Sequence, residues 1–204
     1  FLVNDQGALV SAHSFLEDGK GFAPDDGPDV VRDGVLCELR PRPAKSIRSM
    51  LISLQETLTT AHMMAASLGL KLSAETTMEI GAETLDDCPN DAKVFGCDAD
   101  MSAYTGEYQR VKVNAAKYPY RHCGGHIHIG TKEIESFEEL LSLIKVFDLI
   151  VGTGSVLMDH NEGSIHRRKL YGSAGSFRLQ PHGMEYRTPS NFWLKSPILT
   201  HAIL

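Results

Sequence analysis

The sequence predicts an α+β protein in which a curved, mostly antiparallel sheet carries long helices packed on one face. The prediction depends on the order of hydrophobic patterns along the 204 residues. Short strand-like segments come first, a long segment with helical spacing follows, and both patterns recur before a last strand. We expect a single domain over residues 1–204. Because the chain starts at Phe1 in a strand-like run and ends in a helix-like one, we also expect that both ends were cut from a longer chain.

The expected strands are short apolar or alternating segments that lie between turn-forming residues. They comprise residues 2–3, 8–10, 34–40, 71–80, 124–130 and 183–188. Asp5 to Gly7 supply the turn between the first two strands, and Pro41 stops the third. Residues 81–118 show no regular pattern, and residues 160–182 are polar and basic.

The expected helices have apolar side chains at helical spacing and recognisable ends. Residues 44–68 form the longest such segment, and Gly69 is a suitable C-terminal stop. Ser136 and Glu139 form a capping box, which predicts a second helix starting there. A closing helix can start at either of two serines near the C-terminus. These are Ser190 and Ser196.

Composition limits the classes of partner. Apolar residues make up 42% and charged residues 23%, which is typical of a globular protein, and the formal charge is −6. Such a surface does not attract nucleic acid in general, so any basic site must be local. Charged residues interrupt the apolar stretches before ~20 residues, so we expect no membrane span. The four cysteines form no C-x-x-C pair, and we expect free thiols in a reducing cytoplasm.

Two histidines alternate in the segment Gly124 to Gly130. In a strand, His126 and His128 point to one face while the isoleucines between and after them point into the core. Two glycines before the pair and one after it leave room for a ligand near the backbone. The alternative is a pair of solvent-facing histidines on an ordinary strand. We favour a metal-dependent site.

Two Glu-x-Arg segments end in the same way. Glu38 and Arg40 share one strand face, Glu185 and Arg187 share another, and a proline follows each pair. Alone, each pair is typical of a surface ion pair. Together with a histidine, carboxylates on one sheet face favour Mg²⁺ or Mn²⁺. Glu79, with Glu75 on the same face of another strand, is a further candidate ligand.

A local basic run interrupts the acidic chain. It contains His166, Arg167, Arg168, Lys169 and, beyond several glycines and serines, Arg178. This local reversal of charge favours binding of a polyphosphate, and the alternative is a solvated basic face. Arg121, just before the histidine strand, is a further candidate for anion binding. The sequence contains neither a G-x-x-x-x-G-K-[ST] loop nor a G-x-G-x-x-G motif, so metals and arginines would have to hold a nucleotide.

Four motifs in a fixed order carry a resemblance to a known family. They are Glu-Leu-Arg-Pro at residues 38–41, Arg-x-x-Gly-Gly-His-Ile-His-Ile-Gly at 121–130, Arg-Arg-x-x-Tyr-Gly at 167–172 and Glu-Tyr-Arg-Thr-Pro-Ser-Asn-Phe-Trp at 185–193. Over roughly residues 1 to 195 the sequence resembles the glutamine synthetase-like carboxylate–amine ligases. It is most similar to the phage-type branch, the COOH–NH2 ligases of type 2.

The resemblance implies an ATP-dependent ligase on a curved antiparallel sheet that holds two or more Mg²⁺ or Mn²⁺ ions. A carboxylate substrate would be phosphorylated to an acyl phosphate, which an amine then displaces to form an amide. The substrates would be a small-molecule or peptide carboxylate and an amine, and a homo-oligomer is possible for this fold. The family also has an Asp-Pro-Glu-Phe-like segment that donates a metal carboxylate, and we expect that segment to lie before Phe1.

Residue roles follow by position in the matching motifs, joined to the candidates above. The expected metal ligands are Glu38, His126, Glu185 and Glu79. The expected nucleotide contacts are His128, Arg167, Arg168, Lys169 and Arg178. The expected catalytic residues are Arg187, Arg168 and Arg121.

Two other functions remain open at this stage. The first is a zinc-dependent hydrolase, for which the candidate ligands are His122, Cys123, His126 and His128. Against it, these four lie too close in sequence for an easy tetrahedral site on one strand. The second is a nucleotide-binding module of the same fold that has lost turnover.

Overall fold

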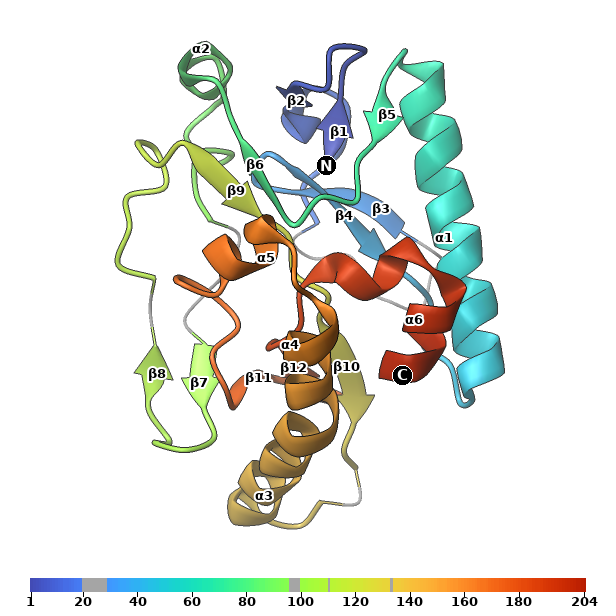
Figure 1. The fold of residues 1–204 in the computed structure, drawn as a ribbon, viewed down its shortest axis with the longest axis vertical. Helices are drawn as coiled ribbons and strands as arrows, with labels where there is room; N and C mark the ends of the chain where they lie inside the picture. The colour runs from blue at the N-terminus through green and yellow to red at the C-terminus, as the bar shows by residue number, and fades with distance from the viewer. Residues whose placement is uncertain (20–28, 96–99, 110, 133) are drawn as a thin grey trace.

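The computed structural model describes residues 1–19, 29–95, 100–109, 111–132 and 134–204. All pairings between its named strands are antiparallel, and helices pack beside the sheets (Figure 1), which confirms an α+β fold. The strands differ from the expected single curved sheet in one respect. They are distributed over one sheet of five strands, one of three and two of two.

The five-stranded sheet has the order β10-β12-β11-β7-β8. Its strands are β10 (Ile127–Gly130), β12 (Gly183–Tyr186), β11 (Ser176–Gln180), β7 (Asp100–Ser102) and β8 (Tyr108–Gln109). One face is apolar, and helix α3 (Phe137–Phe147) packs against it. The core between them includes Met101, Leu140, Ile144, Phe177, Met184 and Tyr186. Burying this face on one side leaves the opposite face for polar residues.

The N-terminal part forms the smaller sheets. These contain β1 (Leu2–Val3), β2 (Leu9–Val10) and β5 (Lys71–Leu72) in one sheet, β3 (Asp29–Asp33) with β4 (Leu36–Arg40) in another, and β6 (Thr77–Glu79) with β9 (Tyr120–His122) in the last. Helix α1 (Ile47–Ser67) runs along one side of them in Figure 1 and contacts β3, β4 and β5.

Helix ends agree with the capping signals. Ser136 accepts a hydrogen bond from the amide of Glu139 at 3.1 Å, and Gly69, just after α1, has φ +69°. Both candidate serines near the C-terminus are caps. Ser190 caps a short 3-10 helix, η4 (Asn191–Lys195), and Ser196 caps α6 (Pro197–Ile203).

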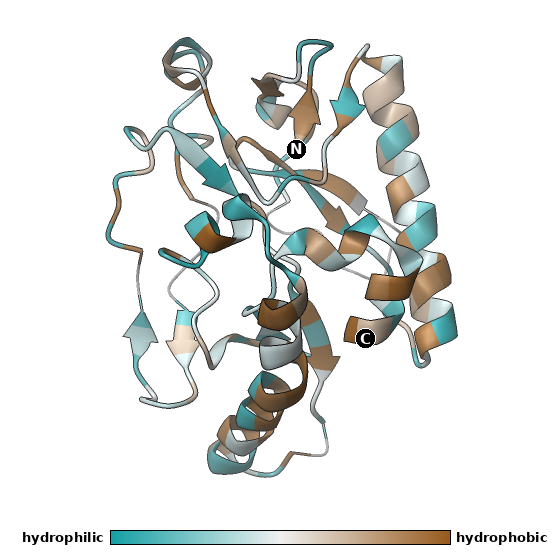
Figure 2. Ribbon diagram, viewed as in Figure 1, coloured by the Kyte–Doolittle hydropathy of each residue, from teal (hydrophilic) through white to brown (hydrophobic). Residues whose placement is uncertain are grey.

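One helix is unusually apolar on its exposed side. After α3 the chain continues through a π-helical turn, η3 (Asp148–Gly152), into α4 (Thr153–Met158). By length and composition alone the stretch Phe137–Met158 could cross a membrane, and 28% of its most apolar window is buried inside the protein. Figure 2 shows the apolar residues along it. Lys145 and Asp148 lie within the stretch, and the expected absence of a membrane span stays a prediction.

Three segments differ from expectation. Residues 71–80 are two short strands in different sheets, β5 and β6, and not one strand. Residues 81–118 contain α2 (Ala82–Asp86), β7 and β8, although they carry no clear pattern. Residues 160–182 contain α5 (Glu162–Arg167) and β11. A further 3-10 helix, η1 (Ala12–Ser14), follows β2.

The cysteines agree with the expected free thiols as far as the structure describes them. Cys37, Cys88 and Cys123 are free. Cys97 lies outside the described residues.

Candidate active site

The unburied face of the five-stranded sheet is polar. In the sheet register Glu185 of β12 stands opposite His128 of β10 on one side and Arg178 of β11 on the other. Residues directly opposite each other in antiparallel strands have their side chains on the same face. The neighbouring residues Phe177 and Tyr186 point the other way and are fully buried in the core. The alternation therefore separates a charged face from an apolar face, as the histidine and Glu-x-Arg spacing predicts.

Glu185 is the centre of a buried ionic cluster on this face. Its side chain is 4% exposed, and its Oε1 lies 2.8 Å from Nδ1 of His126. The same oxygen accepts a hydrogen bond from the guanidinium of Arg187. The other oxygen, Oε2, accepts a hydrogen bond from Gln180 at 3.0 Å and lies 3.6 Å from Arg178. Four neighbours thus hold the carboxylate in one orientation.

Asp100 of β7 adds a second carboxylate to the cluster. Its Oδ1 lies 2.7 Å from Nε of Arg187 and 3.8 Å from Nη2 of Arg178, and its Oδ2 accepts a hydrogen bond from Ser176 at 3.1 Å. Two carboxylates and two guanidinium groups therefore alternate and balance in charge. Sequence reasoning missed Asp100 because its strand has only three residues and no alternating pattern.

The protonation states in the cluster follow from burial and from Arg187. Burial alone would raise the pKa of Glu185, but the hydrogen bond from His126 and the charge of Arg187 outweigh it and lower the pKa far below its ordinary range. Burial and the charge of Arg187 lower the pKa of His126 to about 4. At neutral pH Glu185 is ionised and His126 is neutral. Nδ1 of His126 lies 2.8 Å from Oε1 of Glu185, which accepts a proton, and 3.1 Å from Nη1 of Arg187, which donates one.

A carboxyl group of the β3–β4 hairpin is coupled to the same cluster. Burial and the charge of Glu38 raise the pKa of Asp33 to about 6, while the charges of Arg187, Arg40 and Arg178 act against this rise. The coupling places Asp33 near the arginines of the sheet face. Asp33 is not among the residues predicted from the sequence, because an Asp before a Gly is typical of an ordinary turn. Perturbed carboxyl groups of this kind are frequent at functional sites.

Glu38 and His128 lie at the margin of the cluster. Glu38 accepts a hydrogen bond from Arg40 at 2.8 Å, and its side chain is 39% exposed. His128 is exposed, and its Nδ1 lies 3.2 Å from Nε2 of His182, in the turn between β11 and β12. His182 is a second residue that sequence reasoning missed, since its proximity depends on the pairing of β10 with β12. Both expected residues face open space near the cluster and stay candidates for ligand contact.

Two of the expected anion-binding arginines are buried and bind backbone. Arg121 is 2% exposed, and its Nη atoms donate to the carbonyls of residues 115, 118 and 120. Arg167 is also 2% exposed and donates to the carbonyls of Thr188 and Arg187. Both guanidinium groups therefore hold the chain around the site together. Their expected contact with phosphate stays a prediction.

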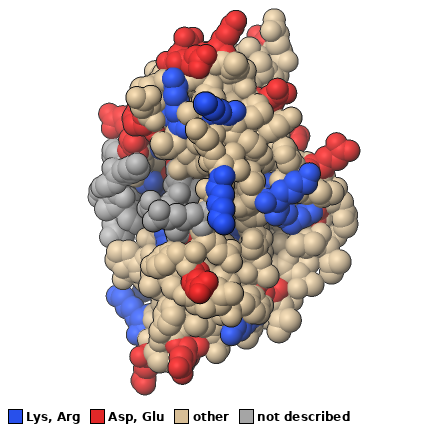
Figure 3. Space-filling view, turned by 90° about the vertical axis from the view of Figure 1, so that its left-hand side faces the viewer, with Lys and Arg blue, Asp and Glu red and all other residues tan. Residues whose placement is uncertain are grey.

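The rest of the basic run separates into individual contacts. Arg168 is half-buried and donates to the carbonyl of Asp159 at 3.4 Å, while Lys169 is exposed. On the face shown in Figure 3, the described Lys and Arg side chains are separated by neutral surface and by acidic groups. The cations of the ionic cluster are thus Arg178 of β11 and Arg187, which directly follows β12.

The expected metal ligands do not form one compact cluster. Within the described ranges, no group of three or more His, Cys, Asp or Glu side chains is close enough to hold a metal ion. His126 and Glu185 contact each other, Glu38 pairs with Arg40, and Glu79 is exposed on β6 in another sheet. The four side chains of the zinc alternative do not converge either.

The glycines before the histidines have a different role from the expected one. A Cβ on Gly124 would lie 2.2 Å from Nε2 of His126, and a Cβ on Gly125 would lie 2.2 Å from Nε1 of Trp193 and 2.3 Å from the carbonyl oxygen of Ser190. The space that we expected a ligand to use is therefore occupied by the protein itself. These glycines allow the histidine ring and the segment after β12 to pack against the backbone.

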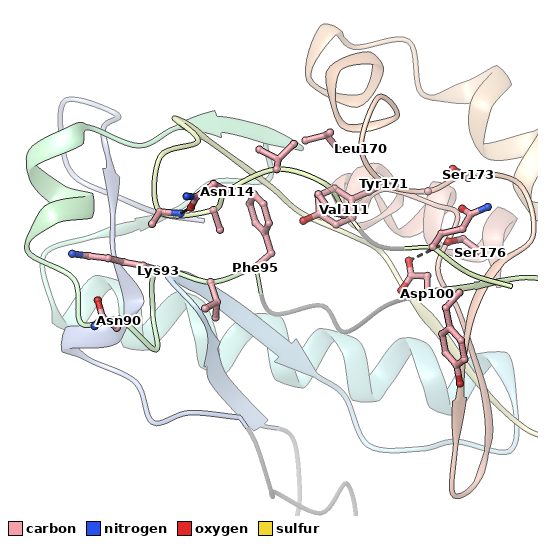
Figure 4. A pocket seen from close by; sticks show the side chains of 17 residues that line it. Asn90, Lys93, Phe95, Asp100, Val111, Asn114, Leu170, Tyr171, Ser173 and Ser176 are labelled. Atoms are coloured by element: carbon pink, nitrogen blue, oxygen red, sulfur yellow. Dashed lines mark hydrogen bonds between the residues drawn. The ribbon is translucent and has the colours of Figure 1, made fainter.

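A cavity of about 950 Å³ adjoins the cluster. Asp100 and Ser176 form part of its wall, and Phe95, Tyr108 and Tyr171 give it an aromatic lining (Figure 4). A volume of this size is within the range of sites for small-molecule ligands. The cavity therefore brings an apolar lining up to the charged sheet face.

The sheet face brings carboxylates, imidazoles and guanidinium groups together next to a cavity, a combination that is frequent at functional sites. The model of the phage phiEco32-like COOH·NH2 ligase type 2 family matches residues 99–204, just over half of the chain. The chain therefore belongs to this family, whose name denotes carboxylate–amine ligases. The match contains all five strands of the large sheet and leaves out the β3–β4 hairpin. No curated protein and no solved structure gave a match.

Proposed function

We propose that this chain catalyses ATP-dependent ligation of a carboxylate to an amine through an acyl phosphate, on the polar face of the five-stranded sheet. The observation that carries the proposal is the buried alternation of Asp100, Arg187, Glu185 and Arg178. Oppositely charged groups in this arrangement form a fixed electrostatic frame. Catalysis of phosphoryl transfer depends mainly on positioning and on electrostatic stabilisation, which such a frame supplies. The family match supports ligation in particular.

The proposed reaction has two steps that balance in atoms and charge. A carboxylate oxygen of the substrate attacks the γ-phosphorus of ATP, the bond to the bridging oxygen breaks, and ADP leaves. The amine nitrogen then attacks the acyl carbon, inorganic phosphate leaves, and the nitrogen loses a proton. Both steps move negative charge among phosphate oxygens, so fixed cations lower both barriers.

Arg178 and Arg187 are the residues we assign to this charge. Arg178 is 24% exposed, so its guanidinium can reach a ligand while it remains near Glu185 and Asp100. Arg187 is 5% exposed and is oriented by two carboxylates. A planar guanidinium in a fixed orientation matches two oxygens of a phosphate or carboxylate. His128, exposed at the edge of the same face, would contact the nucleotide phosphates.

The donor set fits Mg²⁺ or Mn²⁺ held jointly with a nucleotide. Mg²⁺ commonly uses one or two protein carboxylates and completes its shell with water and phosphate oxygens, so a preformed cluster of three ligands is not required. Asp33 and Glu38, two coupled carboxyl groups beside the arginines, would hold it. When bound, the ion neutralises phosphate charge and polarises the transferred group.

The test uses the full-length protein with ATP, Mg²⁺ and a panel of carboxylates and amines, and it measures ADP, phosphate and the amide by mass spectrometry. We expect amide formation in equal amount to ADP, and a loss of about 10²–10³-fold in rate on Arg178→Ala. Lys195→Ala, at an exposed position, is the control. If no pair of substrates yields amide, the ligase proposal is wrong. Nucleotide binding without turnover would favour the inactive binding module.

A further inference from the structure

A second polar cluster lies outside the sheet face, between β9 and α5. Tyr118, Tyr120 and His122 are two residues apart from each other, so they share one side of the extended segment. Oη of Tyr118 lies 3.2 Å from Nε2 of His122 and 3.5 Å from Nε2 of His166, which comes from α5. The side chains of Tyr118, His122 and His166 are half-buried, so small solutes can reach them.

Thr77 orients the first imidazole. Its hydroxyl donates to the carbonyl of Gly163 at 2.6 Å, so the same oxygen accepts the contact of 2.8 Å from Nδ1 of His122. The proton of His122 is therefore on Nδ1, and the lone pair of Nε2 points at Tyr118. Hydrogen bonding of the remote ring nitrogen is the usual way in which proteins orient a metal-binding histidine.

The two separations from Oη of Tyr118 suit a tetrahedral site. Zinc lies about 2.0–2.1 Å from a ligating nitrogen, which places two ligand atoms in a tetrahedron ~3.3 Å apart. The observed separations of 3.2 Å and 3.5 Å from Oη of Tyr118 bracket this value.

Ring packing and charge define the surroundings. The ring of His166 lies 4.7 Å from Tyr120 and 5.4 Å from His122 between centroids, so the imidazoles are oriented by edge contacts. Burial, His166 and the charges of Arg167 and Arg121 lower the pKa of His122 to about 4, so this imidazole is neutral at pH 7. The two arginines disfavour a dication. Burial raises the pKa of Tyr118, so its phenol stays protonated in the metal-free protein, and the phenolate that would offset the arginines forms only when an ion binds.

We propose that Tyr118, His122 and His166 form a binding site for a late first-row transition-metal ion, Zn²⁺ or Cu²⁺. Two imidazoles favour these ions over Mg²⁺, which prefers oxygen ligands. Three protein ligands leave a fourth position for water. On binding, the bond from the Tyr118 oxygen to its proton breaks, a bond from that oxygen to the ion forms, and the proton goes to the buffer. The site is separate from the proposed ligase chemistry and needs no nucleotide.

The site lies behind the aromatic wall of the cavity. Tyr171 has its ring centroid 5.8 Å from that of His122, and Phe95 has its centroid 5.9 Å from that of Tyr118. Both residues also line the cavity (Figure 4). A bound ion would therefore hold this wall in place, which gives the ion a structural role next to the cavity.

The test titrates the EDTA-treated full-length chain with Cu²⁺ alone, and with Zn²⁺ as competitor, while absorption is recorded. We expect saturation at one ion per chain and a phenolate-to-copper charge-transfer band that Zn²⁺ removes. Tyr118→Phe should abolish the band, and His122→Gln and His166→Gln should each weaken binding at least about tenfold. Calorimetry in two buffers should show one proton released per ion by the natural chain and none by Tyr118→Phe.

Two controls locate the ion. Tyr120→Phe keeps the neighbouring ring without its hydroxyl, and His182→Gln disrupts the other close histidine pair, so both should leave the band unchanged. Circular dichroism of each variant shows whether it is folded, and Tyr118→Phe preserves the shape of the side chain. The proposal is overturned if the natural chain binds neither ion, if the band persists in Tyr118→Phe, or if His182→Gln removes it.

Discussion

Asp33→Asn should make the protein more stable and less active at neutral pH. Burial and the charge of Glu38 raise the pKa of Asp33 from its ordinary value of 3.8 to about 6. Above that pH Asp33 is ionised in the folded protein, although its carboxylate is less favourable there than in the unfolded chain. Asparagine has nearly the same shape and no charge to desolvate, so the replacement removes this penalty and also removes an oxygen charge suited to a divalent cation.

The magnitude follows from the difference between 3.8 and about 6. One pKa unit corresponds to about 1.4 kcal/mol, so full ionisation costs about 3 kcal/mol of stability at most. Because Asp33 is only partly buried by surface area, we expect a gain of about 1–3 kcal/mol. The raised pKa gives stability that is complete below pH 3.8 and is lost as the pH rises through about 6. The gain in the variant should therefore grow over this window and be constant above it.

The assay is urea unfolding of both proteins with EDTA and no nucleotide, at a series of pH values across the window. The quantity of interest is the difference in unfolding free energy between variant and natural chain. Asp86→Asn, exposed on α2, controls for the loss of one negative charge. A variant that is less stable at neutral pH, or a difference that does not change with pH, would refute the reasoning. Ligase assays should show lower activity and a higher Mg²⁺ requirement, because the variant lacks one of the two carboxylates proposed to hold the ion.

Three further substitutions test the ionic frame of the site and the packing behind it. Glu185→Gln leaves the buried Arg187 with one carboxylate fewer and should lower the unfolding free energy in urea by about 3 kcal/mol; unchanged stability would contradict the ionic frame. Tyr186→Phe removes the hydrogen bond of 2.6 Å to buried Asp148 and should lower stability by about 1–3 kcal/mol in the same assay. Ser136→Ala removes the N-cap of α3 and should cost about 1 kcal/mol, measured by thermal unfolding.

Local patterns in the sequence were enough where one segment determines its own structure. Ser136 and Ser196 begin their helices because the side chain and the amides it binds lie within three residues. The apolar period of residues 47–67 likewise predicts α1. Alternation predicted that His128 points to one face of its strand while Ile127 and Ile129 point to the other, and these isoleucines pack with the apolar cluster. Each of these features depends on neighbours along the chain.

Features that depend on distant contacts were not predictable. Asp100 belongs to the site only because its strand pairs with β11, more than seventy positions later in the chain. A strand of three residues has too short a pattern to show which face it buries. Arg121 and Arg167 carried the same charge signal as Arg178, yet both are buried against backbone carbonyls. A guanidinium that binds backbone and one that faces a ligand look the same in sequence, because only burial and partner atoms distinguish them.

Gly124 and Gly125 provide a matched pair that separates folding from site geometry. A Cβ at Gly125 would meet the backbone of Ser190, which cannot move without shifting the segment after β12. Gly125→Ala should therefore lower the free energy of unfolding by several kcal/mol. The three atoms nearest to a Cβ at Gly124 all belong to the ring of His126, which can rotate away from Glu185. Gly124→Ala should therefore stay nearly as stable in urea while its ligase activity falls. Equal loss of stability in both variants would contradict this distinction, because among the nearest atoms only those at Gly125 include backbone.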